Sequence, residues 1–379
     1  MIYLDHAATS WPKPRSVIAA VVRAMEAEGG NPGRGSHPLA ERAVERILEC
    51  RVALAELFHI ANLLRICFTA NATEALNLAL KGLLKAGDHA VCSSMEHNAV
   101  WRPLVELSSQ GVQFAIAPAQ EDGRVAPASV LQALRPETRV IVLPHASNVN
   151  GAVNPIAEIG SLARERKIPL LVDASQTAGS LPIDVEAMQI DLLAFPGHKG
   201  LLGPQGTGGL FIREPLLLEA LKVGGTGSNS SSPFVPDYVP DRYESGTLNT
   251  PGIAGLEAGV RHILEQGVEE IQRREWRLTR RLLEGLAGAP RLRLYGPPSS
   301  TLRAPVVSFN LGGKDPVVVA EQLDRKYGVA CRPGLHCAYL AHRTLGTEKT
   351  GTVRFSLGYC TTEREIDEAI RAVRWVAEQ

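Results

Sequence analysis

The sequence lacks the features that would indicate a metal site, a membrane span or a nucleic-acid partner. Its six cysteines are Cys50, Cys67, Cys92, Cys331, Cys337 and Cys360. They form no CxxC pair and show no zinc-ligand spacing, so we expect no metal. Lysine and arginine together number 40, as do aspartate and glutamate, which gives no reason to expect binding to nucleic acid or to a membrane surface.

Long hydrophobic runs are also missing. No apolar run approaches the ~20 residues of a membrane helix. The N-terminus reads MIYLDH and meets an acid and a histidine at once, unlike a signal peptide. We therefore expect a cytoplasmic enzyme with reduced thiols.

What the sequence does contain, from about residue 65 to 213, is an alternation of short apolar runs with helix-like stretches. We expect strands near 65–69, 90–92, 112–117, 139–143, 170–172, 192–194 and 209–212, and helices over 73–84 and 156–166. Strands that alternate with helices predict an α/β fold with a mostly parallel sheet covered on both faces. Ligands bind such sheets at the carboxyl ends of the strands.

The pattern changes after residue 213. Residues 224–240 are rich in Gly, Ser, Asn and Pro, and in a compact enzyme such a segment is more often a binding loop than a linker. A long helical region follows over 253–286, with Gly267 as a possible interruption. Later we expect strands at 306–309 and 352–356, and helices at 317–326 and from 363. The sequence thus predicts a large domain over 15–252 and a smaller α+β domain over 253–379.

Two strand ends carry the residues that suggest a cofactor. One apolar run ends in Asp173, and the next leads through Pro196, Gly197 and His198 to Lys199. This pairing suits pyridoxal 5′-phosphate (PLP): the lysine would hold it as a Schiff base, and the aspartate would keep its pyridine nitrogen protonated. The alternative is a solvated lysine and an aspartate that opens a turn.

A second candidate site lies where a strand turns into a helix, at residues 69–74. The amides and the positive end of a helix N-terminus bind phosphate, and the Thr73 hydroxyl adds a donor. The same residues also fit a capping box, with Asn71 as the cap and Glu74 three positions later. The two interpretations are compatible.

Arg354 and Cys337 are candidates for substrate chemistry. Arg354 lies among strand-forming residues, and a buried arginine needs an anion, either the α-carboxylate of an amino acid or a structural salt-bridge partner. Cys337 lies in a Gly-containing loop, whereas Cys67 and Cys92 lie in apolar runs typical of buried cysteines. Arg332 and His336 nearby favour a reactive thiol at Cys337.

Nine short stretches match one known family in order. They are YLDHAAT (3–9), FTANATEA (68–75), EHN (96–98), SNVNG (147–151), VDASQ (172–176), GHK (197–199), ESGT (244–247), GLHCA (334–338) and VRFS (353–356). Over nearly its whole length the chain resembles the class V aminotransferase family, most closely the cysteine desulfurase and selenocysteine lyase group. The resemblance implies the PLP-dependent transferase fold, like that of aspartate aminotransferase, with residues 1–14 joining the small domain.

The resemblance also implies roles for residues that bind the cofactor. Phosphate would be held by Ala72 through its backbone, by Thr73, by His198 and, across a homodimer, by Thr247 of the neighbouring subunit. His97 would stack on the pyridine ring and move protons, while Gln176 and Asn148 would bond the phenolic oxygen. The family often has Ser or Thr where this chain has Pro196, a departure that bears on cofactor affinity.

For the substrate, the resemblance implies that Arg354 and Asn148 bind an amino acid and that Cys337 accepts its sulfur. Arg332 contacts either the substrate or only neighbouring backbone. The implied activity is a cysteine desulfurase that leaves alanine and a persulfide on Cys337, with a sulfur-acceptor protein and a role in iron–sulfur cluster assembly. Alternatives are a selenocysteine lyase acting on L-selenocysteine, a class V epimerase or transaminase, and a non-catalytic PLP-binding protein.

Overall fold

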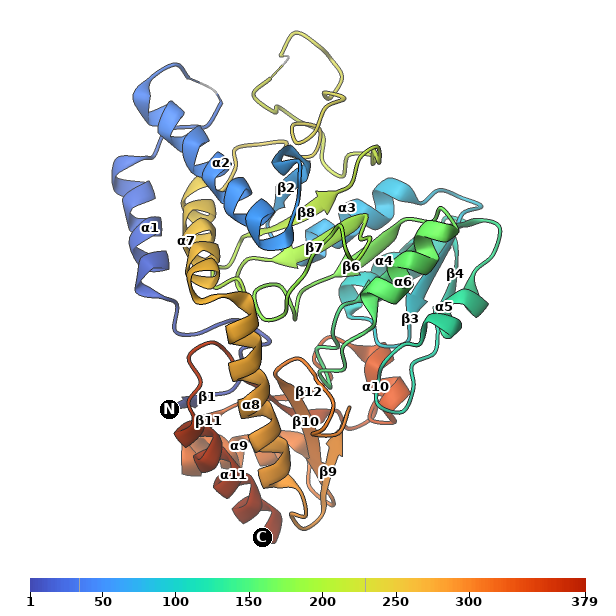
Figure 1. Cartoon of the computed structure of the whole chain (residues 1–379), viewed down its shortest axis with the longest axis vertical. Helices are drawn as coiled ribbons and strands as arrows, with labels where there is room; N and C mark the ends of the chain where they lie inside the picture. Colours follow the sequence, from blue (N-terminus) through green and yellow to red (C-terminus); the bar gives the residue numbers. More distant parts are fainter. Residues whose placement is uncertain (34, 229) are drawn as a thin grey trace.

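The chain forms a large seven-stranded sheet wrapped by helices, with two smaller sheets beside it (Figure 1). The computed structural model describes residues 1–33, 35–228 and 230–379. The large sheet has the order β2-β8-β7-β6-β5-β3-β4. Its strands are β2 (Ile66–Thr69), β3 (His89–Ser93), β4 (Gln113–Ala117), β5 (Thr138–Pro144), β6 (Leu170–Asp173), β7 (Leu192–Pro196) and β8 (Gly208–Ile212). All its strand pairs are parallel except those of β8 with β2 and β7.

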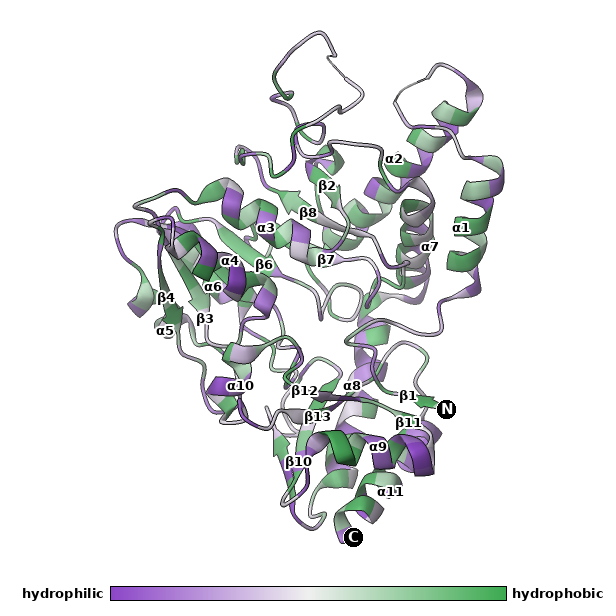
Figure 2. Ribbon diagram, turned by 180° about the vertical axis from the view of Figure 1, so that it is seen from behind, coloured by the Kyte–Doolittle hydropathy of each residue, from purple (hydrophilic) through white to green (hydrophobic). Residues whose placement is uncertain are grey.

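Helices cover both faces of this sheet, because successive strand residues point to opposite sides. On β3, Val91 packs into the core shared with helices α2 (Pro38–Phe58), α6 (Ile156–Glu165) and α7 (Thr250–Gln266). Its neighbour Cys92 packs on the other face against helices α3 (Ala72–Leu83) and α4 (Asn98–Ser108). Figure 2 shows the central strands in hydrophobic colours, as a sheet buried on both faces requires.

Most of the remaining elements form the lower part of the molecule in Figure 1. An antiparallel sheet has the order β12-β13-β10-β9. Its strands are β9 (Leu292–Tyr295), β10 (Val306–Leu311), β12 (Arg332–Gly334) and β13 (Thr352–Ser356). The helices of this part are α8 (Val268–Leu286), α9 (Pro316–Tyr327), α10 (Tyr339–Leu345) and α11 (Glu363–Glu378), while α1 (Arg15–Ala27) and the short α5 (Pro127–Ala133) belong to the upper part.

The predicted alternation of strands and helices is confirmed, and each expected strand of the large sheet is present within one or two residues of its predicted bounds. The helix expected over 253–286 is two helices, α7 and α8, which meet at Gly267. Gly267 has a φ of 79°, a backbone conformation that residues with a side chain rarely adopt. Residue 229 lies outside the described residues; the rest of the predicted 224–240 loop contains no helix or strand.

The N-terminal residues lie beside the smaller sheets. Strand β1 (Ile2–Tyr3) pairs in parallel with β11 (Val329–Ala330), and Ile2 and Leu4 pack into the core of that part. Helix α7 instead packs with α1 and α2, and its Ile253 and Leu256 belong to the core of the large sheet. A boundary at residue 252 would thus fall inside α7. The division into 15–252 and 1–14 with 253–379 stays a prediction.

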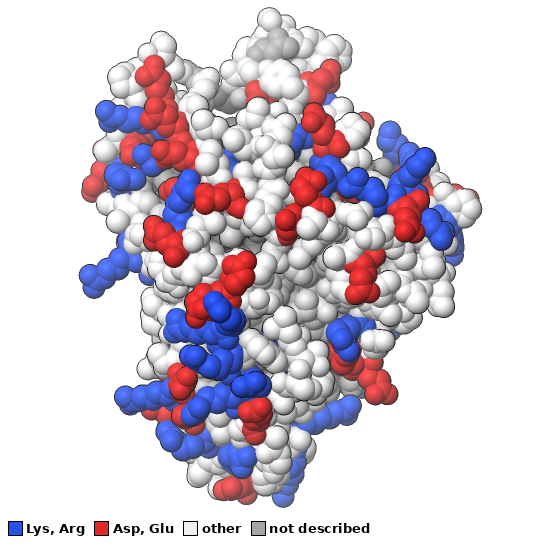
Figure 3. Space-filling view, viewed as in Figure 1, with Lys and Arg blue, Asp and Glu red and all other residues white. Residues whose placement is uncertain are grey.

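Charge is spread in local pairs over the surface. Figure 3 shows Lys and Arg side chains gathered over the lower part of the molecule, where α8 lies. Two arginines of this helix, Arg277 and Arg281, are paired with Glu363 and Asp367 of α11.

Among the described residues, no helix combines the length and hydropathy that a membrane crossing requires.

Candidate active site

Asp173 and Lys199 follow neighbouring strands at one edge of the large sheet. Asp173 is the last residue of β6 and pairs in register with Ala194 of β7, the strand that leads into Lys199. Burial lowers the pKa of Lys199 from 10.5 to about 8, against the attraction of the Asp173 carboxylate. Near neutral pH this amine is therefore much more readily deprotonated than an ordinary lysine, as a nucleophilic amine requires.

The cavity at this edge brings together most of the predicted cofactor residues. They are Ala72, Thr73, His97, Asn148, Asp173, Gln176, His198 and Lys199. Pro196 also lines it, so a pyrrolidine ring stands where the family often has a hydroxyl. Thr247 lines a different depression, together with Thr69 and Gly206. Its predicted contact is with a neighbouring subunit and stays a prediction.

The N-terminus of α3 leaves two donors free at this cavity. The Asn71 side chain caps the helix by accepting from the Glu74 N–H at 2.9 Å. Within the described part of the chain, no hydrogen bond uses the N–H of Ala72 or Thr73. A phosphate oxygen fits such a pair of first-turn amides. The predicted Asn71 cap is confirmed, and it leaves these amides available for the phosphate, whose binding here stays a prediction.

His97 caps α4 and presents one ring nitrogen to the cavity. Its Nδ1 accepts from the Ala99 N–H at 3.0 Å. Burial and the charge of Lys199 lower the pKa of His97 to about 4, so the ring is neutral at pH 7 and its proton is on Nε2. An uncharged imidazole with a free Nε2–H suits stacking on an aromatic ring and proton transfer.

His198 and Gln176 both line this cavity. The His198 ring is neutral at pH 7 because burial lowers its pKa to about 4, and its buried Nδ1 has no partner among the described residues. That nitrogen is free to bind an incoming phosphate. Gln176 donates from Nε2 to the Ala7 carbonyl at 3.3 Å.

Arg354 is a fully buried arginine of β13 that already has an anion. Its Nη2 donates to Asp5 Oδ1 at 2.8 Å, and its Nη1 donates to the Asn148 carbonyl at 3.1 Å. The salt bridge weighed as an alternative is therefore present. The Nε of Arg354 is buried without a partner in the described chain, which leaves one donor for another anion. Its role toward a substrate stays a prediction.

Cys337 lies on an exposed turn between β12 and α10, and hydrogen bonds to two carbonyls of this turn hold its backbone in place. The Cys337 carbonyl accepts from the Asn98 N–H at 2.7 Å, next to His97. The Asn148 side chain donates to the His336 carbonyl at 2.8 Å. His336 and Cys337 both have positive φ, 49° and 57°. Such non-glycine backbone costs on the order of 1 kcal/mol or more for each residue and persists only where surrounding contacts hold it.

The predicted substrate residues lie within electrostatic reach of the lysine. The charges of Arg354 and Arg332 lower the pKa of Lys199, and that of Cys337 raises it, each by less than burial does. Arg332 donates from Nη2 to Cys337 Sγ at 3.4 Å. One site therefore combines a reactive amine, a neutral imidazole, two guanidinium groups and an exposed thiol.

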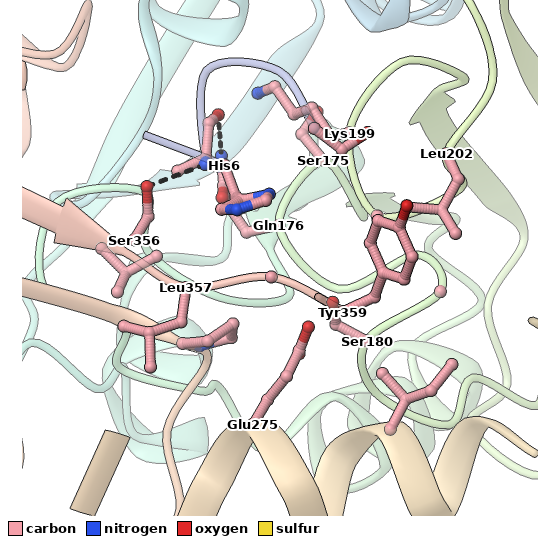
Figure 4. Close-up of a pocket in the computed structure, with 18 of the residues that line it drawn as sticks. His6, Ser175, Gln176, Ser180, Lys199, Leu202, Glu275, Ser356, Leu357 and Tyr359 are labelled. Atoms are coloured by element: carbon pink, nitrogen blue, oxygen red, sulfur yellow. Dashed lines mark hydrogen bonds between the residues drawn. The ribbon is translucent and has the colours of Figure 1, made fainter. Parts of the chain in front are cut away.

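A second cavity lies on the other side of Lys199, between the large sheet and the small one (Figure 4). Ser175, Gln176 and Lys199 line both cavities. Glu275 projects into it from α8 toward Ser180 and Tyr359, as Figure 4 shows. Burial raises the pKa of Glu275 to about 8, so this acid is protonated at neutral pH.

Sequence reasoning missed three polar residues of this region. Asp5 holds Arg354, although its stretch was among those matched to the family. Lys13 donates from Nζ to the His198 carbonyl at 2.8 Å. His145 follows β5 and is buried, and its N–H donates to the Asp173 carbonyl at 2.9 Å. The rule that ligands gather at strand ends could have found His145; the other two contacts depend on long-range packing.

Comparisons with known proteins identify the family to which the chain belongs. The family model of class V aminotransferases matches residues 2–369, and the chain belongs to that family. A probable cysteine desulfurase of Methanothermobacter thermautotrophicus is 36% identical over 375 residues, 96% of this chain and 92% of that protein. A cysteine desulfurase of Escherichia coli O127:H6 is 32% identical over 386 residues, 99% of this chain and 93% of that protein. The apo structure of a cysteine desulfurase from Thermococcus onnurineus NA1 superposes with a TM-score of 0.92 at 31% identity, covering 100% of this chain and 94% of that one.

Members of this family are PLP-dependent enzymes, and the residues present fit that cofactor. The free amides of Ala72 and Thr73 and the unpartnered Nδ1 of His198 suit its phosphate. The Asp173 carboxylate at the neighbouring strand end suits its pyridine nitrogen, and the Lys199 amine suits its aldehyde carbon.

Proposed function

We propose that this protein is a cysteine desulfurase that converts L-cysteine to L-alanine and transfers the sulfur to Cys337 as a persulfide. The observation that carries the proposal is the exposed thiol of Cys337 beside Arg332, in electrostatic reach of the cofactor lysine. A transaminase or epimerase needs no such thiol. The relatives that match nearly the whole chain are named cysteine desulfurases, which supports the same activity.

When bound, PLP supplies an electron sink that eases bond breaking at the substrate α-carbon. Lys199 would hold it covalently, Asp173 would bind its ring nitrogen, and Ala72, Thr73 and His198 would hold its phosphate. With a pKa of about 8, Lys199 can both accept and return a proton near neutral pH. The neutral ring of His97 lines the same cavity and can pass protons on.

Three residues would bind the substrate and take its sulfur: Arg354, Asn148 and Cys337. Arg354, whose Nε has no partner among the described residues, would bind the α-carboxylate of L-cysteine beside Asn148. The sulfur of Cys337 then forms a bond to the substrate sulfur as the carbon–sulfur bond breaks, and the β-carbon gains a proton. The net change, L-cysteine and a thiol to L-alanine and a persulfide, needs no outside oxidant.

The proposal also includes a homodimer, a cellular location and a protein that accepts the sulfur. Exposed apolar side chains recur at helical spacing along α1 (Ile18, Val22, Met25) and along α2 (Val44, Leu48, Val52), a pattern that supports a protein partner. A homodimer would place Thr247 at the phosphate of the neighbouring subunit. We further propose a cytoplasmic location, a sulfur-acceptor protein and a role in iron–sulfur cluster assembly.

The proposal is tested by supplying L-cysteine and L-selenocysteine side by side and measuring alanine with sulfide or selenide. Alanine and sulfide in equal amounts from L-cysteine, in the presence of a reductant, are expected. Release from L-selenocysteine alone would identify a selenocysteine lyase instead. Formation of 3-mercaptopyruvate or D-cysteine, with the carbon–sulfur bond intact and no sulfide, would identify a transaminase or an epimerase.

A further inference from the structure

Three buried side chains form a hydrogen-bonded series directly behind the Cys337 turn. His336 Nδ1 lies 3.2 Å from His342 Nε2, and His342 Nδ1 lies 2.8 Å from Thr347 Oγ1. At the other end, His336 Nε2 lies 3.0 Å from the Arg332 carbonyl oxygen. All three side chains are almost completely buried. The series therefore links His342 of α10, and Thr347 just after this helix, to the strand that precedes the cysteine.

The protons of this series can be assigned from one fixed point. A carbonyl oxygen only accepts, so His336 carries its proton on Nε2 and donates it to Arg332. Burial and the nearby Arg354 lower the pKa of His336 to about 2 and that of His342 to about 4, so neither ring has a second proton at pH 7. His336 Nδ1 then accepts from His342 Nε2, and His342 Nδ1 accepts from the Thr347 hydroxyl. Every bond of the series thus runs in one direction.

The series meets the thiol through Arg332. The carbonyl of Arg332 receives the last hydrogen bond, while its guanidinium donates to Cys337 Sγ at 3.4 Å. Between them, His336 and Cys337 hold left-handed backbone conformations that residues with a side chain rarely adopt without support. The carbonyls of both residues are also fixed, by Asn148 and Asn98. The imidazole series is the support on the remaining, buried side of the turn.

We infer that His342, held by Thr347, is a positioning residue that fixes the Cys337 thiol through His336 and Arg332. This inference rests on the proposed function insofar as the thiol is the sulfur acceptor. His342 contacts neither the cavity nor the thiol itself. Its effect is to restrict where the sulfur of Cys337 can stand relative to a substrate bound at Arg354.

The test compares His342→Leu with a matched control elsewhere in the fold. His89, at the start of β3 and far from the carboxyl ends of the strands, is also buried and forms one His–Thr bond, with Thr138 Oγ1 at 2.9 Å. His89→Leu removes a similar buried hydrogen bond without touching the Cys337 turn. His342→Gln restores one donor and one acceptor about as far apart as the two ring nitrogens.

For His342→Leu we expect kcat for alanine release to fall about 10- to 100-fold, because a displaced acceptor atom slows transfer steeply. KM for L-cysteine and the visible absorption of bound PLP should stay within twofold, since Arg354 and Lys199 are unchanged. His342→Gln should recover much of kcat. His89→Leu should lower the melting temperature and leave kcat unchanged.

Long-range ¹⁵N–¹H spectra of protein labelled at histidine provide a readout that needs no activity. Both rings should appear as Nε2–H tautomers at pH 7. An Nδ1–H tautomer at either residue, or unchanged kcat in a folded His342→Leu protein, would overturn the inference. If the wild-type protein releases no alanine, the proposed function fails, and alkylation of Cys337 in place of kcat decides the positioning role: His342→Leu must change its rate and His342→Gln must restore it.

Discussion

The Nη2 of Arg332 lies 3.4 Å from the Sγ of Cys337, so a guanidinium group faces the candidate acceptor thiol directly. Of the six cysteines, all of which the structure describes, Cys337 alone is exposed. The planar fork of arginine offers several N–H donors in fixed directions, whereas lysine offers a compact point charge. The contact therefore gives the thiol a defined orientation as well as a neighbouring charge.

Arg332→Lys should lower kcat for sulfur release by about 10-fold through loss of the oriented donor. The charge is kept, so PLP binding should be unaffected. Arg343→Lys on α10 is the control, because Arg343 makes no side-chain contact with the thiol among the described residues. Equal kcat for Arg332→Lys and the wild type would mean that the guanidinium group does not orient the thiol. Arg332 would then contribute only through its backbone carbonyl, which accepts from His336.

Lys199 is expected to hold PLP covalently. The purified protein should be yellow, and borohydride should fix the cofactor to the peptide that contains Lys199. Lys199→Ala should lose this attachment and the activity, while Lys81→Ala, which removes a partly exposed lysine paired with Glu106, should keep both. Mass analysis that finds the label on any other lysine would contradict the assignment.

Thr247→Ala tests the proposed dimer and its shared phosphate site. With Pro196 in place of a hydroxyl, loss of the Thr247 hydroxyl should weaken PLP binding by about 1 kcal/mol, or several-fold in Kd. Thr301→Ala, in a loop of the small sheet, serves as the control. Sedimentation should find a dimer in both variants; an active monomer with unchanged PLP affinity would refute the prediction.

Glu275→Gln should change how stability depends on pH. The pKa of Glu275 is about 8 in the folded protein and 4.5 for an ordinary glutamate, so the folded state binds the proton more tightly. Raising the pH from 4.5 to 8 therefore destabilises the wild type by up to about 1.4 kcal/mol per pH unit. Glutamine has no such proton to lose.

Melting temperatures of the wild type and Glu275→Gln measured from pH 5 to 9 should thus diverge as the pH rises, with the variant gaining. Glu106→Gln, at a side chain that is 55% exposed, should follow the wild type. Parallel curves for wild type and Glu275→Gln would show that the acid is ionised in the folded protein.

The large sheet and the cofactor residues could be predicted because their signals are local. Apolar runs identify the strands, and Asp173 and Lys199 follow two of them directly, so the parallel sheet alone brings them together. The Asn71 cap and the phosphate amides likewise lie within a few residues of each other. The motifs matched to a family then supplied roles that spacing could not.

Other features depend on contacts between residues distant in sequence. The bond between Asp5 and Arg354 spans nearly the whole chain, and the burial of Glu275 depends on how α8 packs against both sheets. Neither residue type nor periodicity carries that information. The His336–His342 contact lies within one helical turn and a loop, yet its meaning depends on the carbonyl of Arg332, which only the fold supplies.

The central claim is that Cys337 accepts sulfur, and Cys337→Ser tests it most directly. Serine keeps the size but is a poor nucleophile toward sulfur at neutral pH. The variant should still bind PLP and L-cysteine, but its sulfide release should fall by ~100-fold or more. In the wild type, alkylation after L-cysteine turnover, followed by mass analysis, should find one extra sulfur on Cys337 and on none of the other five cysteines. Undiminished sulfide release by Cys337→Ser, or extra sulfur on a different cysteine, would contradict the account.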